Sequence, residues 1–357
     1  MVQQISAPCK INLHLKIKPG RPDGFHDLES VFVLVDFADT LVFQPPHPPS
    51  RAGDQAGGRI SGGKEPGEIR VSMRPAGPFL ELISRNSLVF EEIPPEKNLV
   101  YRAAALFRQR TGFSPALDIT VVKRIPPGSG LGGGSSNAAA VLLALNARAA
   151  AAGLSLSRVE LLRMAAELGS DVSFFIHAGH AAGETAGYAA WVAGRGERIK
   201  PLPPPPPLGL LLVFPAFPSH TGAAFALLDR IRGESASPPP VSPLTYGRVR
   251  RVLKKWPAPA DAGPPADARR LPAVWPFGND FLDLFLNHGP ENQRAVYAGI
   301  LGDLKAAGAF FTGLSGSGSA CFGIFKSLKE AEGAKKTLKK ASYAVQSTFF
   351  LARPPRW

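Results

Sequence analysis

A glycine-rich stretch at residues 126–138 constrains this chain more than any other feature of its sequence. It has the sequence Pro-Pro-Gly-Ser-Gly-Leu-Gly-Gly-Gly-Ser-Ser-Asn-Ala. The residues before it, 117–122, favour a strand, and the Ala-rich residues after it, 135–152, favour a helix. Glycines let backbone N–H groups approach a ligand closely, and a helix N-terminus favours negative charge. The stretch therefore predicts an anion site, to which Ser135 and Ser136 can add hydroxyl groups that reach phosphate oxygen or Mg²⁺.

Three known phosphate-binding loops do not fit this stretch. A Walker A loop needs Lys followed by Ser or Thr after its last glycine, and no Lys stands there. Gly128, Gly130 and Gly133 satisfy G-x-G-x-x-G, but a dinucleotide-binding fold then requires a second strand, whereas residues 138–168 favour two helices. The protein-kinase glycine loop joins two strands, and here a helix follows. A plain flexible linker is disfavoured, because strand, loop and helix occur in the order that an anion site requires.

Composition narrows the class of protein. The 357 residues suggest two domains, and 45% hydrophobic residues are enough for buried cores, which excludes fibrous and disordered proteins. The net charge of +13 favours anionic partners such as phosphorylated metabolites, nucleotides, nucleic acid or a membrane surface. Cys9 and Cys321 cannot form a disulfide framework, and the N-terminus lacks the apolar region of a signal peptide. The longest strongly apolar run, 208–214, is too short to span a bilayer, so we expect a soluble cytoplasmic protein.

Residues 9–17 alternate between apolar and polar side chains, the period typical of a half-buried strand. The turn sequence at 19–24 and the apolar run 31–37 complete a predicted hairpin. One face of the first strand carries Ile11, Leu13, Leu15 and Ile17, and the other carries Lys10, Asn12, His14 and Lys16.

The rest of the chain divides into ordered and irregular segments. Helices are expected at 98–110, 157–168, 221–232, 291–307 and 328–340, and strands at 210–214, around 310 and at 320–325. The helix at 157–168 begins with a capping-box pattern, Ser157 followed three residues later by Glu160. Two Pro-rich stretches, 45–78 and 235–276, are expected to be irregular insertions. The proline run 201–207 predicts a boundary between domains at 1–200 and 208–357.

The glycine-rich stretch resembles the central motif of the GHMP kinases, a superfamily that includes galactokinase, homoserine kinase and mevalonate kinase. Further segments are similar to the superfamily in the same order: residues 7–15, 23–28, 98–104, 168–175 and 314–321. The resemblance implies a two-domain α+β protein, with an N-terminal α/β domain like ribosomal protein S5 domain 2. The C-terminal domain would be ferredoxin-like, and the active site would lie between the two.

The implied activity is phosphorylation of an alcohol by ATP with Mg²⁺. Residues 7–15, 23–28 and 168–175 resemble the branch of the superfamily that phosphorylates the 2-hydroxyl of a CDP-linked methylerythritol in the non-mevalonate isoprenoid pathway. A GHMP kinase for another alcohol, of the homoserine or mevalonate type, is the alternative within the class. The other alternative is an RNA-binding protein with an S5-like fold, although the chain lacks the aromatic-basic interleaving of RNA-reading surfaces.

The resemblance assigns catalysis to Asp171 and Lys10. A positioned carboxylate can take the proton of an alcohol as the phosphoryl group arrives, and a neighbouring cation keeps that carboxylate ionised. Without the resemblance, Asp171 would fit a helix N-cap and Lys10 a solvated strand lysine.

The resemblance also assigns two sets of binding residues. The substrate set, with Phe25 and His26 where the family commonly has a Tyr-His pair against the cytosine ring, comprises Asn12, Phe25, His26, Thr221 and Phe225. The ATP set comprises Asn98, Lys123, Pro126, Gly128, Ser129, Gly130, Leu131, Gly132, Gly133, Gly134, Ser135, Ser136, Asn137, Ser315, Gly316 and Gly318.

No protein ligand for a metal is assigned firmly, since only Ser135 or Ser136 is a candidate for Mg²⁺. The family usually continues from the segment 168–175 toward Gly-x-Gly-Glu, and residues 180–188 depart from that pattern. The expected partner is a small CDP-linked polyol, with neither nucleic acid nor membrane, bound by a monomer or homodimer.

Overall fold

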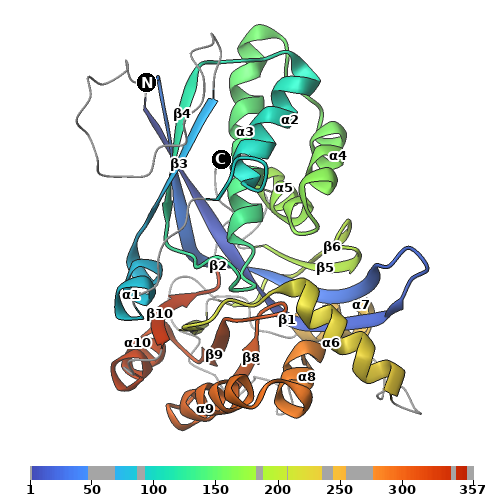
Figure 1. Ribbon diagram of the computed structural model, residues 1–357, viewed down its shortest axis with the longest axis vertical. Helices are drawn as coiled ribbons and strands as arrows, with labels where there is room; N and C mark the ends of the chain where they lie inside the picture. The colour runs from blue at the N-terminus through green and yellow to red at the C-terminus, as the bar shows by residue number, and fades with distance from the viewer. Residues whose placement is uncertain are drawn as a thin grey trace.

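Two β-sheets covered by helices make up the part of the chain that the structure, a computed structural model, describes (Figure 1). The described residues are 2–46, 69–86, 93–181, 188–206, 208–234, 244–254, 276–338 and 343–351. None of the helices in these ranges is long and apolar enough to cross a membrane.

The first sheet has the strand order β3-β4-β2-β5-β6, with β1 paired to β2 off this path. Strand β3 runs parallel to β4, and the other pairs are antiparallel. Its strands are β1 (Gln3–Gly20), β2 (His26–Gln44), β3 (Ile69–Pro75), β4 (Leu117–Lys123), β5 (Ala189–Gly194) and β6 (Arg198–Leu202).

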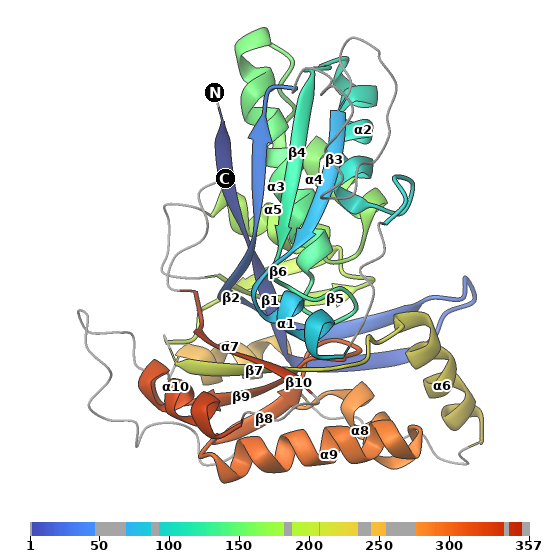
Figure 2. The same cartoon turned by 60° about the vertical axis from the view of Figure 1, so that its left-hand side comes forward.

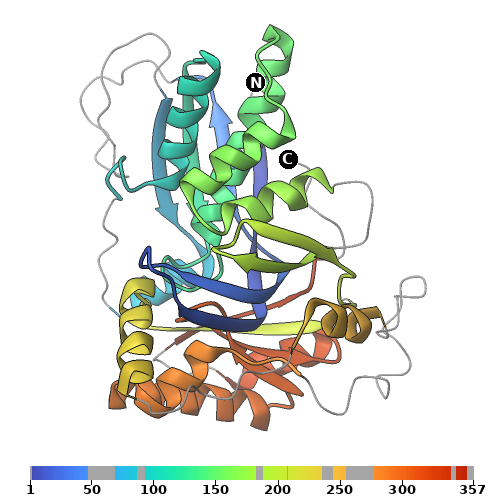
Figure 3. The same cartoon turned by 90° about the vertical axis from the view of Figure 1, so that its right-hand side faces the viewer.

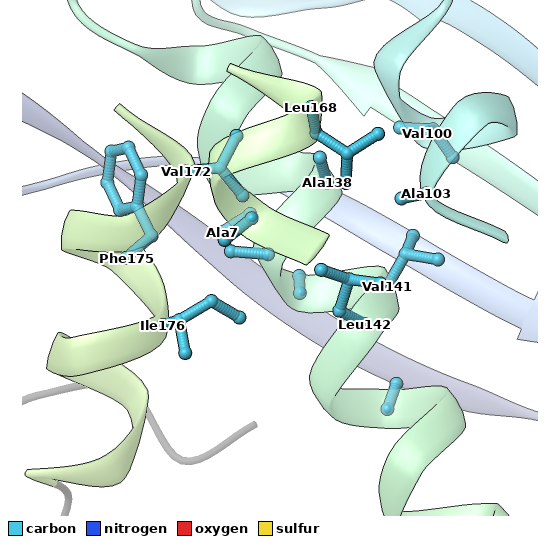
Figure 4. Packing of buried hydrophobic residues seen from close by; sticks show 14 of the residues in the cluster. Ala7, Val100, Ala103, Ala138, Val141, Leu142, Leu168, Val172, Phe175 and Ile176 are labelled. Carbon is cyan, nitrogen blue, oxygen red and sulfur yellow. The ribbon is translucent and has the colours of Figure 1, made fainter. Parts of the chain in front are cut away.

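The helices beside this sheet pack closely because α3 presents alanines to its neighbours. These helices are α2 (Leu99–Thr111), α3 (Gly133–Ala149), α4 (Arg158–Leu168) and α5 (Val172–His180), with a short 3₁₀ turn, η1 (Ala150–Ala152), after α3. Helix α1 (Gly77–Arg85) lies apart from them, and its Leu82 belongs to the core between the two sheets. Figure 4 shows apolar side chains of this cluster, among them Val100 of α2, Ala138 of α3 and Val172 of α5, together with Ala7 of β1. This cluster holds the glycine-rich start of α3 against the sheet.

The second sheet is antiparallel throughout, in the order β10-β7-β9-β8. Helices α8 and α9 lie beneath it, and α6 stands beside the β1–β2 hairpin (Figure 2). The strands are β7 (Gly209–Pro215), β8 (Phe311–Leu314), β9 (Cys321–Phe325) and β10 (Tyr343–Phe349). The helices are α6 (Thr221–Glu234), α7 (Tyr246–Lys254), α8 (Asp280–His288), α9 (Glu291–Ala306) and α10 (Leu328–Thr337).

The β1–β2 hairpin connects the two halves of the molecule (Figure 3). Near the start of β1, Ala7 belongs to the core beneath α3, whereas Leu15 and Ile17 belong to the core of the second sheet and α8. The polar face expected to make β1 half-buried is buried as well: Lys10, Asn12, His14 and Lys16 are each at most 7% exposed. The expectation of a half-buried strand is therefore wrong, because elements distant in sequence cover both faces.

Most of the predicted helices and strands are confirmed within a few residues, including the capping box of Ser157 and Glu160. Helix α3 starts at Gly133, two residues earlier than expected. Two expectations of irregular structure are wrong, since β3 lies within 45–78 and α7 within 235–276. In these two stretches, residues 47–68, 235–243 and 255–275 lie outside the described ranges.

Tertiary packing explains both errors. Ile69 and Val71 are buried against the first core, and Val249 and Leu253, one helical turn apart, are buried in the core between the sheets. The proline run 201–207 falls between β6 of the first sheet and β7 of the second. The division at 1–200 and 208–357 stays a prediction.

Asp39 of β2 is a fully buried carboxylate that ties the glycine-rich stretch to the first sheet. It accepts hydrogen bonds from the backbone N–H groups of Arg124 (2.7 Å) and Ile125 (2.9 Å) and from Nδ2 of Asn137 (3.0 Å). It also forms an ion pair with Lys123, which is itself 5% exposed. These contacts position both ends of the loop, the end of β4 and the first turns of α3.

The Asp39→Ala variant is expected to lose about 3–5 kcal/mol of unfolding free energy, because it leaves the Lys123 ammonium buried without its counter-ion. Urea denaturation of the purified protein measures the loss. The control, Glu167→Ala, removes an exposed ion pair with Arg110 at 2.7 Å and should cost less than about 1 kcal/mol. Equal, small losses in both variants would contradict the structural role of Asp39.

His177 of α5 makes the stability of the fold depend on pH. Burial, followed by the charges of Arg158 and His180, lowers the pKa of His177 to about 4. The unfolded chain therefore binds more protons than the folded chain between about pH 6.5 and pH 4. Stability should be complete above pH 6.5 and decline as the pH falls toward 4.

Urea midpoints measured between pH 7.5 and pH 4.5 test this dependence. The His177→Gln variant should show a shallower decline than the unchanged protein. Some decline remains, because burial also lowers the pKa of His14. Parallel curves for the two proteins would show that His177 does not contribute.

Candidate active site

A cavity of about 560 Å³ opens where the glycine-rich loop, the β1–β2 hairpin and α6 meet. It brings together residues from both predicted catalytic positions and from all of the predicted substrate positions. The predicted residues that line it are Lys10, Asn12, Phe25, His26, Gly130, Gly132, Asp171, Thr221, Phe225 and Gly316. Arg195, Asp229, Phe281 and Ser317 also line it, and the sequence did not single them out.

Lys10 lies at the floor of the cavity and is not a solvated strand lysine. Its side chain is 3% exposed. The ammonium group donates to Oδ1 of Asn12 (2.6 Å) and to the carbonyl oxygen of Gly130 (2.9 Å), and lies 3.3 Å from Oδ2 of Asp171. A buried cation is stable only when such partners replace its water. Lys10 thus joins β1 to the glycine-rich loop and to the start of α5.

Asp171 occupies the N-cap position of α5, but its side chain caps nothing. The carboxylate instead faces Lys10, and the side chain is 28% exposed at the cavity. The interpretation of Asp171 as a mere helix cap therefore does not fit its geometry. A carboxylate held beside a cation and open to a cavity can accept a proton from a bound alcohol.

The glycine-rich loop packs against a second loop at 315–319. Gly130 has φ +74°, and a Cβ on it would lie 2.0 Å from the carbonyl oxygen of Ser315, so only glycine fits. The Ser315 hydroxyl donates to the carbonyl oxygen of Gly130 (3.0 Å), and the Ser319 N–H donates to that of Gly128 (3.0 Å). The two loops therefore pack together and form one wall of the site.

Asn279 fastens this second loop to α8 and was missed by the sequence analysis. Its Nδ2 donates to the carbonyl oxygens of Leu314 (2.7 Å) and Gly316 (2.9 Å). Its Oδ1 caps α8 by accepting from the backbone N–H of Phe281 (2.9 Å). Asn before an apolar helix is a recognisable cap signal, but its second bond to a distant loop has no signature in sequence.

The opposite end of the cavity is aromatic. The rings of His26 and Phe225 stack, with centroids 4.9 Å apart and planes at 22°. The second nitrogen of the His26 ring, Nε2, lies 2.8 Å from Oδ1 of Asp229 on α6. The guanidinium carbon of Arg195 lies 3.6 Å from the centroid of the Phe25 ring, which is 47% exposed. This end offers flat apolar surface with a few polar edges, a suitable environment for a heterocyclic base.

Comparison with known proteins identifies the family. Residues 98–179 match the model of the GHMP kinases N terminal domain, and residues 284–344 match GHMP kinases C terminal. A 4-diphosphocytidyl-2-C-methyl-D-erythritol kinase from Anaeromyxobacter dehalogenans (strain 2CP-C) is 35% identical over 92% of this chain and 82% of that protein. The chain belongs to this kinase family. The kinase of the same name from Prosthecochloris aestuarii (strain DSM 271 / SK 413) is 31% identical over 96% of each chain.

Solved structures agree with this assignment to the GHMP kinases. A crystal structure of 4-(cytidine 5'-diphospho)-2C-methyl-D-erythritol kinase superposes with a TM-score of 0.64 at 28% identity, covering 98% of this chain and 100% of that one. A crystal structure of mevalonate kinase gives a TM-score of 0.52 at 12% identity, covering 98% of this chain and 100% of that one, and shares the fold. The predicted two-domain GHMP kinase fold is thereby confirmed.

Several residues predicted to bind nucleotide lie behind the loop of this GHMP kinase and do not line the cavity. Lys123 forms an ion pair with Asp39. Its ammonium group lies close behind the start of α3, since a Cβ on Gly133 would lie 3.0 Å from it. Asn98 caps α2 by accepting from the backbone N–H of Val100 (3.0 Å). Pro126, Ser129 and Leu131 are buried within the loop, and Gly133, Gly134, Ser135 and Ser136 form the first turn of α3.

Three buried polar atoms near this loop lack a hydrogen-bond partner among the described residues: Nδ2 of Asn98, Oγ of Ser136 and Oδ1 of Asn137. Such atoms are rare in folded proteins, because each costs the free energy of its lost hydration. All three belong to the predicted ATP set. Their arrangement fits a site that is completed by a polar ligand.

The Gly-x-Gly-Glu pattern sought at 180–188 occurs instead at Gly194–Glu197, in the turn between β5 and β6. This turn carries Arg195 to the cavity. Most of the segment where the departure was expected, residues 182–187, lies outside the described residues.

The Gly130→Ala variant is expected to raise the Kd for a non-hydrolysable ATP analogue about tenfold or more, because its Cβ drives the two loops apart. Isothermal titration of the folded variant measures the affinity. Gly299→Ala serves as the control, since a Cβ there, in helix α9, meets nothing within 4 Å. If both variants bind the analogue as the unchanged protein does, contact between the loops does not shape the nucleotide site.

Proposed function

We propose that this protein transfers the γ-phosphoryl group of ATP to the 2-hydroxyl of 4-diphosphocytidyl-2-C-methyl-D-erythritol, a step of the non-mevalonate isoprenoid pathway. The observation that carries the proposal is the pairing of Lys10 and Asp171, 3.3 Å apart, in a cavity that also contains the aromatic pair His26 and Phe225. One end of the cavity supports proton removal and the other suits a pyrimidine base.

In the proposed step, Asp171 accepts the proton of the substrate hydroxyl while its oxygen attacks the γ-phosphorus. The new O–P bond forms as the bond between that phosphorus and the β–γ bridging oxygen breaks, and ADP leaves with the electron pair. Lys10, beside that carboxylate, stabilises the negative charge that develops on the attacking oxygen. Asn12 orients Lys10, because its Oδ1 accepts a hydrogen bond from the ammonium group (2.6 Å).

ATP is proposed to bind along the glycine-rich loop and the N-terminus of α3. Backbone N–H groups there would hold the phosphates, and the partnerless atoms of Asn98, Ser136 and Asn137 are available to the nucleotide. Within the described residues no group of three or more His, Cys, Asp or Glu side chains could hold a metal. Mg²⁺ usually takes few protein ligands besides substrate phosphates, and Ser135 or Ser136 would supply a hydroxyl. When bound, Mg²⁺ neutralises phosphate charge.

Lys123 would act on the nucleotide through the loop that it supports, since Asp39 holds its ammonium group. Ser315, Gly316 and Gly318 would close on the phosphates from the second loop. Thr221 links that loop to α6 by a 2.9 Å hydrogen bond between its hydroxyl and that of Ser317. Substrate binding would therefore be coupled to the position of the phosphate loops.

A GHMP kinase that acts on homoserine or mevalonate is the alternative. The likeness to solved structures of those kinases, at 12% and 16% identity, concerns the fold. The stacked His26 and Phe225 favour a substrate with a planar base, which neither alternative substrate has. We therefore propose a small CDP-linked polyol as the partner and a cytoplasmic location for the protein.

A coupled ADP-release assay tests the proposal. With ATP, Mg²⁺ and the CDP-linked methylerythritol, ADP should form in proportion to substrate, whereas homoserine and mevalonate should give only background release. Turnover of one of these alcohols, with the CDP-linked substrate ignored, would overturn the substrate assignment.

The Asp171→Asn variant should lose about 10²–10⁴-fold in kcat, because the amide cannot accept the proton. ATP should still bind, because Asn has the size of Asp and adds no negative charge to the cavity that Asp171 lines. Glu167→Gln, in an exposed ion pair with Arg110, provides the control and should retain activity. Near-normal kcat in Asp171→Asn would refute its role as the base.

A further inference from the structure

Asp229 of α6 contacts the ring of His26 at the aromatic end of the cavity. Its Oδ1 lies 2.8 Å from Nε2 of His26, whose side chain is 6% exposed, whereas the side chain of Asp229 is 54% exposed. Within the described part of the chain, this is the hydrogen bond that the His26 side chain makes, and the other ring nitrogen, Nδ1, has none. His26 lines the cavity, so a bound ligand can supply the partner of Nδ1.

Asp229 lies on helix α6, which stands beside the β1–β2 hairpin (Figure 2). Phe225, one turn before Asp229, stacks on His26. It also packs edge-on against Phe281, with the two ring centroids 5.0 Å apart. Arg232, one turn after it, donates to the carbonyl oxygens of Ile17 (2.8 Å) and Lys18 (3.1 Å) on β1. Three successive turns of one helix face thus fix the ring and its carboxylate partner relative to the hairpin.

A neutral histidine ring carries one N–H, and the hydrogen bond that it makes decides which nitrogen carries it. A carboxylate accepts and cannot donate, so Asp229 favours the form with hydrogen on Nε2. Nδ1 is then a lone pair that only accepts. Phe225 already covers one face of the His26 ring. A ligand can therefore meet the edge of that ring or its other face.

We propose that Asp229 is a positioning residue that makes Nδ1 of His26 an obligatory acceptor and thereby selects cytosine over uracil. The proposal rests on the proposed function, in which His26 meets the base of the CDP group. Cytosine carries an amino group at ring position 4, which can donate to Nδ1. Uracil carries an oxygen there, which would face the lone pair of Nδ1 with no hydrogen between them.

The selectivity should be large because a site that forms a hydrogen bond with a substrate group rejects the analogue without it. Removal of Asp229 frees the ring to carry its hydrogen on Nδ1 and to donate to the oxygen of uracil. The ratio of the two affinities therefore reports the tautomer. A merely structural role for Asp229 would weaken both bases equally and leave that ratio unchanged.

The experiment compares the unchanged protein with Asp229→Leu, Asp229→Asn and, as a control on the same helix, Arg230→Ala. CMP and UMP are the binding probes in isothermal titration at pH 8, where histidine side chains are generally neutral. The kcat/KM for the CDP-linked methylerythritol and its uridine counterpart is measured in parallel. Because Asp229 is half exposed, its replacement should leave the fold intact.

Asp229→Leu should lower the cytosine-to-uracil ratio by about tenfold or more, and Asp229→Asn should lie between it and the unchanged protein. Arg230→Ala should keep the original ratio. An unaltered ratio in Asp229→Leu would overturn the proposal. If instead the unchanged protein neither binds CMP nor turns over the CDP-linked substrate, the proposed function itself fails.

Nitrogen-15 NMR of the imidazole rings observes the tautomer directly, with the His26→Asn spectrum assigning the signal of His26. The unchanged protein should show hydrogen on Nε2, and Asp229→Leu should show a mixture of both forms. A mixture already present in the unchanged protein would contradict the role given to Asp229.

Discussion

The buried ammonium group of Lys10 is the interaction on which the active site depends. An ammonium ion removed from water costs several kcal/mol unless partners replace its hydration. Asp171, the carbonyl oxygen of Gly130 and Asn12 are those partners, and they come from the start of α5, the glycine-rich loop and β1. If any of these segments moved away, the buried Lys10 ammonium would lose one of the partners that replace its water. The same requirement that stabilises the arrangement holds a carboxylate beside this cation at the cavity.

Next to Lys10, the glycine-rich loop and the loop at 315–319 pack against each other through their backbones. Gly130 and the carbonyl oxygen of Ser315 come so close that no side chain fits between the loops, and Asn279 holds the second loop from behind. Backbone N–H groups thereby remain near the proposed phosphate position. The aromatic end is built differently, from rings stacked between the hairpin and α6. The wall proposed to bind phosphates and the aromatic end proposed to bind a base are thus joined by β1.

Local patterns predicted much of this protein because they act over a few residues. The strand, glycines and helix of the phosphate loop, the capping box of α4 and the periodicity of α9 all follow from neighbouring residues. The same reasoning failed for β3 and α7, whose few apolar residues lie in Pro-rich stretches and become significant only against a core. It also missed Asn279, Arg195 and Asp229, since each acts on a residue far away in the chain.

By itself the sequence determined the motif order, the family and the identity of Lys10 and Asp171 as candidates, because these depend on residue type and short spacing. Only the tertiary structure decided that Lys10 is buried beside Asp171, that Lys123 faces Asp39, and that Asp229 reaches His26. The physical reason is that burial and charge pairing depend on distances in space. Lys123 and Asp39 are 84 positions apart in the sequence, and Asp229 and His26 are 203 positions apart. Spacing along the chain does not determine these distances. They are set when both sheets pack against the β1–β2 hairpin.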